Sequence, residues 1–382
     1  MPYYGGAVFY SPIICSDKMY KPEELAIYIH WPFCKSKCPY CDFYKEVNRN
    51  INQNDIIEEY LSALHRYYDL LPNRHVKSIF FGGGTPSLIE AKNIEKIIDF
   101  ITKYWKISQN IEISLEANPN TRYDTMFKDF KNAGINRLSL GVQALNDDDL
   151  HFLGRSHNVK TARLCLQEIV QVFNNHSADL IYALPQQSLK SWSQQLEEIC
   201  SFSLKHLSLY QLTIEENTVF ARRGIKPLDE EKSVEIYNYT RNYLSKKNYK
   251  HYEVSNFAVS GYESKHNLTY WQGGEYIGIG KSAHGRICIN NQHFAVTYPF
   301  NNEKLTSQQR AEELIIMGLR LTEGINKADF QNICGINFYN FINLEKLNQL
   351  KELGMLIESP THVFVSYKGF LLIDAIIAEL CS

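Results

Sequence analysis

Three cysteines near the amino end of the chain are the residues best suited to chemistry. Cys34, Cys38 and Cys41 are spaced CxxxCxxC within the segment IYIHWPFCKSKCPYCDFYK. With this spacing, one short loop can direct all three thiolates at a single point. A cubane [4Fe–4S] cluster has four irons and is usually held by four cysteine thiolates. Three local cysteines therefore predict a cluster with one iron open to an exchangeable ligand.

Other uses of these cysteines stay open from the residues alone. A structural zinc site needs a fourth Cys or His at short range, and the nearest candidate, His30, precedes the loop in an expected strand. Disulfide pairing is disfavoured because the nine cysteines are odd in number and no secretory signal is recognisable. The cysteines outside the loop are solitary and are expected to be buried small hydrophobes: Cys15, Cys165, Cys200, Cys288, Cys334 and Cys381.

The composition is that of a globular protein. Hydrophobic residues make up 44% and charged residues 21% of the 382 positions, which are ordinary values. The formal net charge is −2 and no dense basic run occurs, so nucleic-acid binding is not expected. No apolar run approaches the ~18 residues that span a bilayer, and the apolar start MPYYGGAVFYSPIIC lacks a basic beginning and a cleavage site. A cytoplasmic protein without a membrane anchor is predicted.

The cysteine loop follows the first of a series of predicted strands. Leu25 to Ile29 is expected to be a strand, and apolar residues at helical spacing predict a helix over 55–71. Further strands, each followed by a helix, are expected at 76–81, 111–117, 137–142, 178–183 and 206–212. Six such units predict an α/β fold with a parallel sheet, closed as a partial (β/α)6 TIM-like barrel. Chemistry in barrels lies where the strands end.

The pattern changes beyond about Lys250. The segments HYEVSNFA and EYIGIGKSAHG resemble strands, with HNLTYW between them, and from Ser307 the chain reads mainly as helices with a short strand, HVFVSY. We therefore expect an N-terminal tail over 1–24, a barrel over 25–250, and a smaller mixed and helical, winged-helix-like domain over 251–382. Because that domain is not basic, a lid or docking surface is favoured over DNA binding.

Polar residues and glycines follow the predicted strands. GGGTPS, at Gly82 to Ser87, lets the backbone approach a ligand closely, beyond what a tight turn alone requires. Glu116 ends the third strand in SLEANP, where a carboxylate can bind ribose hydroxyls. Its alternative role is a charge at a helix N-terminus. Both segments are candidates for a nucleoside site.

Three more polar residues follow later strands. Gln143 ends RLSLGVQ, Arg155 lies in LGRSHN, and Asp179 opens DLIYALPQ. A guanidinium can make a forked, charge-assisted pair with a ligand carboxylate. Capping or bridging of loops is the alternative for all three residues.

Taken together, these motifs resemble those of a known family. CxxxCxxC, GGGTPS, SLEANP, NRLSLGVQ, LGRSHN and DLIYALPQQ, in this order, resemble radical S-adenosylmethionine proteins related to oxygen-independent coproporphyrinogen III oxidase (dehydrogenase). HYEVSNFA, SKHNLTYW and EYIGIGKSAHG resemble its heme-chaperone branch, the HemW type. Phe43 replaces a further cysteine of the dehydrogenase, and the segment before the first strand is short; both favour the chaperone branch. Ala183 and Gln186 depart from glycines common in that branch.

The resemblance implies a set of cofactor-binding residues. Cys34, Cys38 and Cys41 would hold a [4Fe–4S] cluster, with the amino and carboxylate groups of S-adenosylmethionine on the fourth iron. The nucleoside site would be lined by Tyr28, Tyr40, Gly83, Gly84, Thr85 and Glu116. Positions that contact a second S-adenosylmethionine in the dehydrogenase correspond to Gln143, Arg155 and Asp179.

The resemblance also implies heme. His266 in HNLTYW is the candidate iron ligand, with Tyr270 and Trp271 able to pack on a porphyrin face, although His266 could instead satisfy backbone groups in a turn. His251 and His284 are lesser candidates.

Two functions remain open after this comparison of motifs. The expected function is a heme chaperone that hands heme to an apo-hemoprotein acceptor, with an electron donor such as flavodoxin or ferredoxin. The alternative is the radical enzyme that oxidatively decarboxylates two propionates of coproporphyrinogen III. A zinc-stabilised barrel without redox chemistry is a third possibility, so whether the protein is an enzyme stays open.

Overall fold

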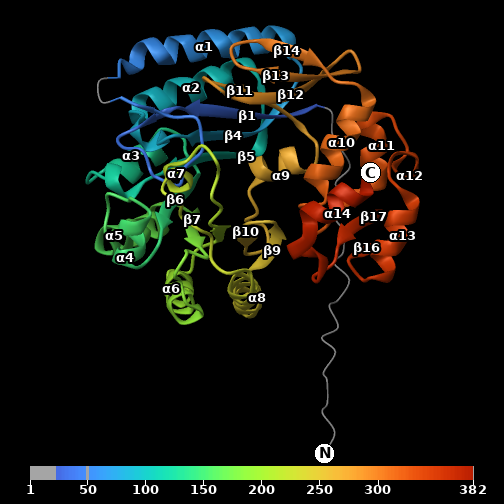
Figure 1. The fold of residues 1–382 in the computed structure, drawn as a ribbon. Coiled ribbons are helices and arrows are strands. Elements are labelled where there is room, and N and C mark those ends of the chain that lie inside the picture. The colour runs from blue at the N-terminus through green and yellow to red at the C-terminus, as the bar shows by residue number, and fades with distance from the viewer. Residues whose placement is uncertain (1–22, 49–50, 382) are drawn as a thin grey trace, which may run out of the picture.

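The computed structural model describes residues 23–48 and 51–381 (Figure 1). The tail expected over 1–24, including Cys15, therefore lies outside the described residues except for its last two positions.

Six parallel strands form the centre of the structure. Each neighbouring pair in the order β1-β4-β5-β6-β7-β8 is parallel, and Figure 1 shows helices on the outside of this sheet. The predicted α/β fold with six parallel strands is confirmed. The strands are β1 (Glu24–Trp31), β4 (His75–Gly83), β5 (Lys106–Ala117), β6 (Arg137–Gln143), β7 (Asn175–Tyr182) and β8 (His206–Gln211).

Amphipathic helices connect the strands. The first, α1 (Gln53–Leu70), buries Ile57, Tyr60, Leu64 and Tyr67, which recur at helical spacing. Side-chain caps begin several of the others. The remaining connecting helices are α2 (Ala91–Tyr104), α3 (Met126–Asn132), α4 (Asp147–Phe152), α5 (Val159–Val172), α6 (Leu189–Ser201), α7 (Val219–Arg222) and α8 (Glu230–Lys246).

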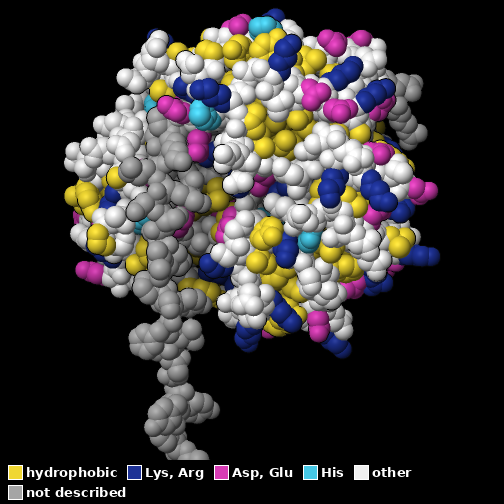
Figure 2. Space-filling view, turned by 180° about the vertical axis from the view of Figure 1, so that it is seen from behind, with side chains coloured by type: hydrophobic (Ala, Val, Ile, Leu, Met, Phe, Trp, Pro, Cys, Tyr) yellow, Lys and Arg dark blue, Asp and Glu magenta, His cyan; other side chains and the backbone are white. Residues whose placement is uncertain are grey.

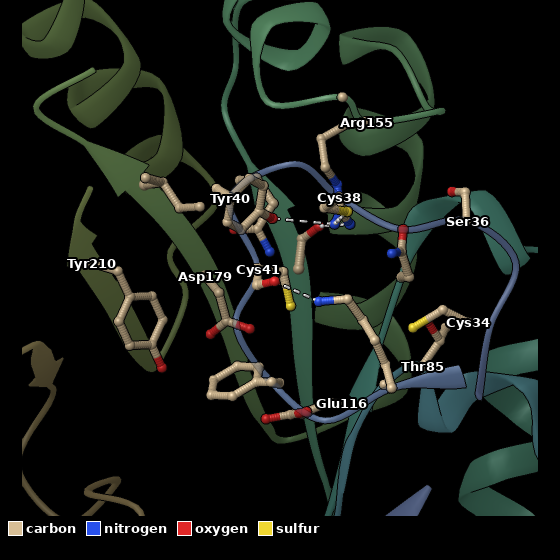
Figure 3. Close-up of a pocket in the computed structure, with 18 of the residues that line it drawn as sticks. Cys34, Ser36, Cys38, Tyr40, Cys41, Thr85, Glu116, Arg155, Asp179 and Tyr210 are labelled. Atoms are coloured by element: carbon tan, nitrogen blue, oxygen red, sulfur yellow. Dashed lines mark hydrogen bonds between the residues drawn. The ribbon is translucent and has the colours of Figure 1, made fainter. Parts of the chain in front are cut away.

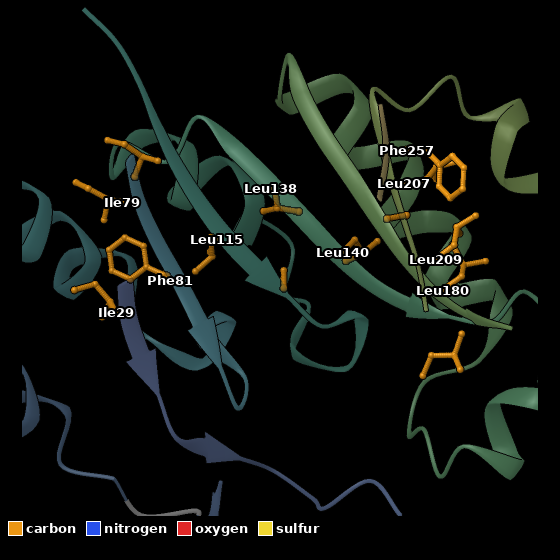
Figure 4. Packing of buried hydrophobic residues seen from close by; sticks show 14 of the residues in the cluster. Ile29, Ile79, Phe81, Leu115, Leu138, Leu140, Leu180, Leu207, Leu209 and Phe257 are labelled. Carbon is orange, nitrogen blue, oxygen red and sulfur yellow. The ribbon is translucent and has the colours of Figure 1, made fainter. Parts of the chain in front are cut away.

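The core lies between the sheet and these helices. Apolar side chains from neighbouring strands pack there, among them Ile79, Phe81, Leu115 and Leu138 (Figure 4). Because side chains alternate along a strand, the positions between them face the inside of the barrel, and many of these are polar. Buried serines occupy that face at positions 78, 114, 139, 177 and 208. A polar interior of this kind can accommodate a polar ligand.

The sheet extends beyond the six predicted strands at both edges. On one edge β11 (Glu275–Ile279) pairs in parallel with β1, followed by the antiparallel strands β12 (His284–Ile289), β13 (Gln292–Thr297) and β14 (Asn301–Lys304). On the other edge β10 (Asn256–Ala258) and β9 (Lys250–Glu253) follow β8. One 12-stranded sheet therefore runs across the division expected after residue 250.

The whole HNLTYW segment is helical. It lies in α9 (Lys265–Trp271), which is anchored to β5 by Glu112. The Glu112 carboxylate accepts hydrogen bonds from the backbone N–H groups of Lys265 (3.1 Å) and His266 (3.2 Å), and it faces Arg137 at 3.9 Å. Glu112 and Arg137 are both buried, so this ion pair fixes α9 against the base of the barrel.

A smaller unit of helices and short strands ends the chain, at the right of Figure 1. A three-stranded antiparallel sheet, in the order β15-β17-β16, packs among the helices. This agrees with the helical, winged-helix-like expectation. Its elements are α10 (Ser307–Gly318), β15 (Ile325–Asn326), α11 (Lys327–Cys334), α12 (Phe338–Phe341), α13 (Leu344–Glu352), β16 (Leu356–Glu358), β17 (His362–Val365) and α14 (Ile373–Leu380).

The surface carries charges of both signs. On the face in Figure 2, lysine and arginine side chains are interspersed with aspartate, glutamate and apolar side chains. Among the described residues, no helix combines the length and apolar character that crossing a bilayer requires.

Candidate functional site

The cysteine loop is closed at its base by a pair of short strands. β2 (Phe33–Cys34) pairs with β3 (Glu46–Val47), so that residues 35–45 form a loop between them. Within the loop, the Cys41 N–H donates to the Cys38 carbonyl (3.3 Å) and Lys45 Nζ donates to the Cys41 carbonyl (2.7 Å). Cys34, Cys38 and Cys41 are free thiols on one closed loop, and all three border the same cavity (Figure 3).

This cavity has a volume of about 340 Å³ and lies at the carboxyl ends of the parallel strands. The cysteine loop forms one side, and the residues that follow β4 to β8 form the rest. In barrel folds, the catalytic and ligand-binding residues lie at this end of the strands.

The glycine turn after β4 packs directly on the start of the cysteine loop. Gly83 has φ +111°, and a Cβ atom there would lie 2.7 Å from His30 Cε1. A Cβ atom at Gly84 would lie 2.8 Å from the Phe33 carbonyl oxygen. The Gly84 N–H donates to the Trp31 carbonyl (2.7 Å). The positive φ of Gly83 therefore favours glycine at that position, and the close contact with the cysteine loop leaves no room for a side chain at either position.

The residue after these glycines contacts a cysteine sulfur. Thr85 Oγ1 donates a hydrogen bond to Cys34 Sγ at 3.4 Å, and both side chains are buried. Burial raises the pKa of the Cys34 thiol, and the Thr85 hydroxyl opposes that shift. The turn thus positions both the cavity wall and one of the three sulfurs.

Two acidic side chains point into the cavity, Glu116 from β5 and Asp179 from β7 (Figure 3). Desolvation, followed by the nearby Asp179 charge, raises the pKa of Glu116 to about 8. Desolvation also raises the pKa of Asp179, although Ser139 donates a hydrogen bond to its carboxylate (2.9 Å). A protonated carboxyl can both donate and accept a hydrogen bond, which suits the hydroxyl groups of a sugar.

A guanidinium lies against a second cysteine sulfur. Arg155 Nη1 is 3.3 Å from Cys38 Sγ and 3.4 Å from Tyr40 Oη, and Nη2 donates to the Gly141 carbonyl at 3.4 Å. Gln143 ends β6 with φ +69°, an uncommon conformation outside glycine. These contacts place a fixed positive charge beside the cysteine loop.

Most of the site residues predicted from the sequence come together in this cavity. Its lining includes Cys34, Cys38, Tyr40, Cys41, Gly83, Gly84, Thr85, Glu116, Gln143, Arg155 and Asp179.

Tyr28, which the resemblance assigns to the nucleoside site, is not among the residues that line this cavity, and that assignment stays a prediction. Its register on β1 pairs it with Phe80, three residues before Gly83, so it lies below the glycine turn. There the Tyr28 hydroxyl bonds to His30 Nδ1 (3.0 Å). No residue of β1 lines the cavity, whose lining begins at Cys34.

His266 also lies outside this cavity. Its side chain is 5% exposed, stacks on Phe80 with ring centroids 4.9 Å apart, and shares a hydrogen bond between Nδ1 and Ser78 Oγ (3.0 Å). Burial lowers its pKa to about 3, so the imidazole is neutral. His251 is likewise packed on an aromatic ring, Phe257, at 4.5 Å, whereas His284 is exposed. The assignment of any of them to heme stays a prediction.

The sequence reasoning did not identify the side chains at the end of β8 and just beyond it. Tyr210 and Gln211, the last two residues of β8, line the cavity together with Thr213 and Glu215, and Tyr210 is 45% exposed. The rule that polar residues end or follow strands would have found Gln211, Thr213 and Glu215. Lys45 also lines the cavity, as the closing residue of the cysteine loop.

Two family models match the sequence. The Radical SAM superfamily matches residues 28–199, and the HemN C-terminal domain matches residues 305–372.

Curated relatives match over almost the whole chain. A heme chaperone HemW from Buchnera aphidicola (Schizaphis graminum) is 35% identical over 373 residues, which cover 94% of this chain and 99% of that protein. The heme chaperone HemW of Haemophilus influenzae is 36% identical, over 84% of this chain and 88% of that protein. A mitochondrial radical S-adenosyl methionine domain-containing protein 1 from Danio rerio is 33% identical, over 96% and 89%.

Among solved structures, coproporphyrinogen III oxidase (HemN) from Escherichia coli is similar in fold. The TM-score is 0.79 at 21% identity, and the match covers 95% of this chain and 91% of that one. This match extends the similarity of fold to both parts of the chain.

Proposed function

Because this chain belongs to the HemW family of heme chaperones within the radical SAM superfamily, we propose that it binds heme and transfers it to an apo-hemoprotein. The observation that carries this proposal is the 35% identity to a heme chaperone over 99% of that protein's length. Membership of this superfamily implies that the chain binds two cofactors, a [4Fe–4S] cluster and S-adenosylmethionine.

The residues around the cysteine loop fit a cluster. Cys34, Cys38 and Cys41 are free thiols at one cavity, and two of their sulfurs have hydrogen-bond donors, Thr85 and Arg155. Donors directed at sulfur stabilise the negative charge of thiolate ligands. The described residues contain no group of three or more His, Cys, Asp and Glu side chains arranged around a single metal ion.

The same cavity fits a nucleoside with an amino acid group. We propose that the backbone of Gly83 and Gly84 lies against S-adenosylmethionine and that the Glu116 carboxyl binds its ribose hydroxyls. Arg155 and Tyr40 would border its methionine end. A reduced cluster supplies an electron to the sulfonium when both groups are bound. The chain's own residues hold the ligand and shield it from water.

Heme transfer needs a partner protein and, if the cluster cycles, a source of electrons. We propose an apo-hemoprotein acceptor and a small electron-transfer protein of the flavodoxin or ferredoxin type. The acceptor follows from the chaperone function of the relatives.

A second candidate function is oxidative decarboxylation of coproporphyrinogen III, favoured by the similarity of fold to the Escherichia coli enzyme. The sequence identity to that enzyme is 21%, well below the identity to the heme chaperones. We therefore place this function second.

One set of experiments tests both candidates. Anaerobically reconstituted protein is titrated with hemin, and a Soret change at micromolar protein is expected. The same preparation, with S-adenosylmethionine and a reductant, is incubated with coproporphyrinogen III. Hemin binding without vinyl product supports the chaperone, whereas absence of the Soret change would refute it, and product formation would favour the enzyme.

A further inference from the structure

The described residues line a second cavity, of about 670 Å³, at the opposite end of the parallel sheet from the cysteine site. Glu24 and His75, at the starts of β1 and β4, line it together with residues of α9 and of the C-terminal unit. Parallel strands begin at one edge of a sheet and end at the other, so this cavity is separate from the cysteine cavity. We propose that it is the docking site of residues 1–22 of the same chain.

The chain enters the described structure at the rim of this cavity. The Glu23 carbonyl accepts a hydrogen bond from the His75 N–H (2.7 Å), and the next residue, Glu24, lines the cavity. Figure 1 shows the start of β1 on the side of the sheet where α9 and α10 lie. Residues 1–22 are therefore tethered to the cavity wall, and a tether raises the effective concentration of a segment to about millimolar. A separate partner has no such advantage.

The lining has the mixed character that the side chains of a polypeptide segment require. Residues 9–14, FYSPII, are mainly apolar and aromatic, whereas residues 17–21, DKMYK, are mainly polar. Apolar side chains of the first stretch gain free energy by leaving water, and the cavity has an apolar wall that can receive them. That wall combines two residues of α9 with three of the C-terminal unit, namely Leu268, Trp271, Leu314, Phe330 and Ile333.

The formal charges of the cavity and of the segment are opposite in sign. The charged side chains of the lining are Glu24, Glu323, Asp329, Lys77 and Lys265. Three carboxylates against two ammonium groups leave an excess of one negative charge. Residues 1–22 contain two lysines and one aspartate, which leave an excess of one positive charge. Complementary charge favours the correct partner and disfavours an anionic ligand.

Backbone groups at this cavity suit an extended chain. Ile325 and Asn326, which form β15, line the cavity, and among the described strands β15 pairs with β17 alone, at the edge of its sheet. Edge strands bind extended segments through main-chain hydrogen bonds. Trp271 also lines the cavity, and its indole Nε1 is buried without a hydrogen-bond partner among the described residues. An extended segment brings carbonyl groups, which are the acceptors that such a donor requires.

A docked segment would join the two parts of the chain at this end. The cavity walls come from the barrel and from the C-terminal unit, so a segment that fills the cavity contacts both. Residues 1–22 then act as an internal strap between the start of the parallel sheet and the C-terminal helices.

Photo-crosslinking of the full-length protein tests this inference. The photoreactive residue p-benzoylphenylalanine replaces Phe9, and mass spectrometry identifies the crosslinked peptides. We expect crosslinks within one chain to residues that line the cavity. In the labelled protein, Leu268→Glu places a charge on the apolar wall and should lower the crosslink yield at least fivefold. The matched control, Leu164→Glu, changes an exposed leucine of α5 outside the cavity, and the yield should stay within twofold.

The position of the crosslinks decides the outcome. Circular dichroism melting verifies that each variant is folded, and if Leu268→Glu does not fold, the crosslinks of the labelled protein alone decide. Crosslinks between two chains, which double the mass, would assign the cavity to a second copy and overturn the inference. Absence of crosslinks to the lining, or an unchanged yield in folded Leu268→Glu, would overturn it as well. None of these results depends on hemin binding, so the proposed function is tested separately.

Discussion

Replacing Gly83 with alanine should distort the turn that joins the strand end to the cysteine loop. Gly83 has φ +111°, and the new Cβ would lie 2.7 Å from His30 Cε1 and 3.0 Å from the Trp31 carbonyl oxygen. A strained backbone conformation costs about 1–3 kcal/mol. The His30 ring is held by Tyr28 (3.0 Å) and by the Tyr44 carbonyl (3.3 Å), and moving it would lose about 0.5–1.5 kcal/mol per hydrogen bond.

These terms give a total loss of about 2–6 kcal/mol in the free energy of unfolding. With an unfolding entropy near 2.1 cal/mol/K per residue, the melting temperature should fall by about 3–8 °C. Because Gly83 lines the cysteine cavity, Gly83→Ala should also weaken S-adenosylmethionine binding to the reconstituted protein. Differential scanning calorimetry and isothermal titration calorimetry measure the two effects.

Gly261→Ala is the matched control for this prediction. Gly261 has φ +89°, but no atom lies within 4 Å of the position of its Cβ. This variant therefore has the backbone strain without the collision and should bind S-adenosylmethionine normally. If Gly83→Ala melts no lower than Gly261→Ala and binds the ligand as wild type does, the argument that the turn requires close approach is refuted.

Three further predictions concern buried charges and the cysteines. Glu112→Ala should lower the free energy of unfolding by about 3–5 kcal/mol in urea titrations, because it leaves the buried Arg137 charge unpaired. Cys38→Ala should lose bound iron after anaerobic reconstitution, whereas Cys165→Ala, which alters a buried cysteine outside the cysteine cavity, should keep it. The pKa of Glu116 is raised to about 8, so wild type should lose stability relative to Glu116→Gln as the pH rises from about 5 to 8. This difference should level off above pH 8 and stay below the limit of about 1.4 kcal/mol per pH unit set by one proton; a constant difference would contradict the shift.

The six strands at the centre of the fold could be predicted from the sequence because each is an apolar run that ends in a recognisable polar or glycine signal. Glu116, for example, follows the apolar residues of β5, and Gly83 and Gly84 follow those of β4. The end of a parallel strand is also where barrels place ligands. Local patterns of this kind therefore predicted both the fold and eleven of the residues that line the cysteine cavity.

Features that depend on distant segments could not be predicted in this way. Nothing in the local pattern of β11 indicates that it pairs with β1, because the two strands lie far apart in the sequence. His266 and Tyr28 are of residue types that bind ligands, and the structure shows that His266 also stacks on Phe80 and that Tyr28 bonds to His30. These contacts with distant or neighbouring residues could not be read from the local pattern. Tyr210 was missed although it lies inside the sixth predicted strand, because the prediction selected only charged and amide residues at the strand ends.

The parallel pairing of β11 with β1 means that β1 cannot be paired on both edges until late in protein synthesis. β1 leaves the ribosome early, and β4 soon follows to cover one of its edges, but the other edge waits for residues 275–279 of the 382. Until then the strand that leads into the cysteine loop carries unpaired N–H and C=O groups, a template for wrong pairing. Iron is therefore best delivered after translation has passed β11, when the growing chain can close the sheet around its first strand.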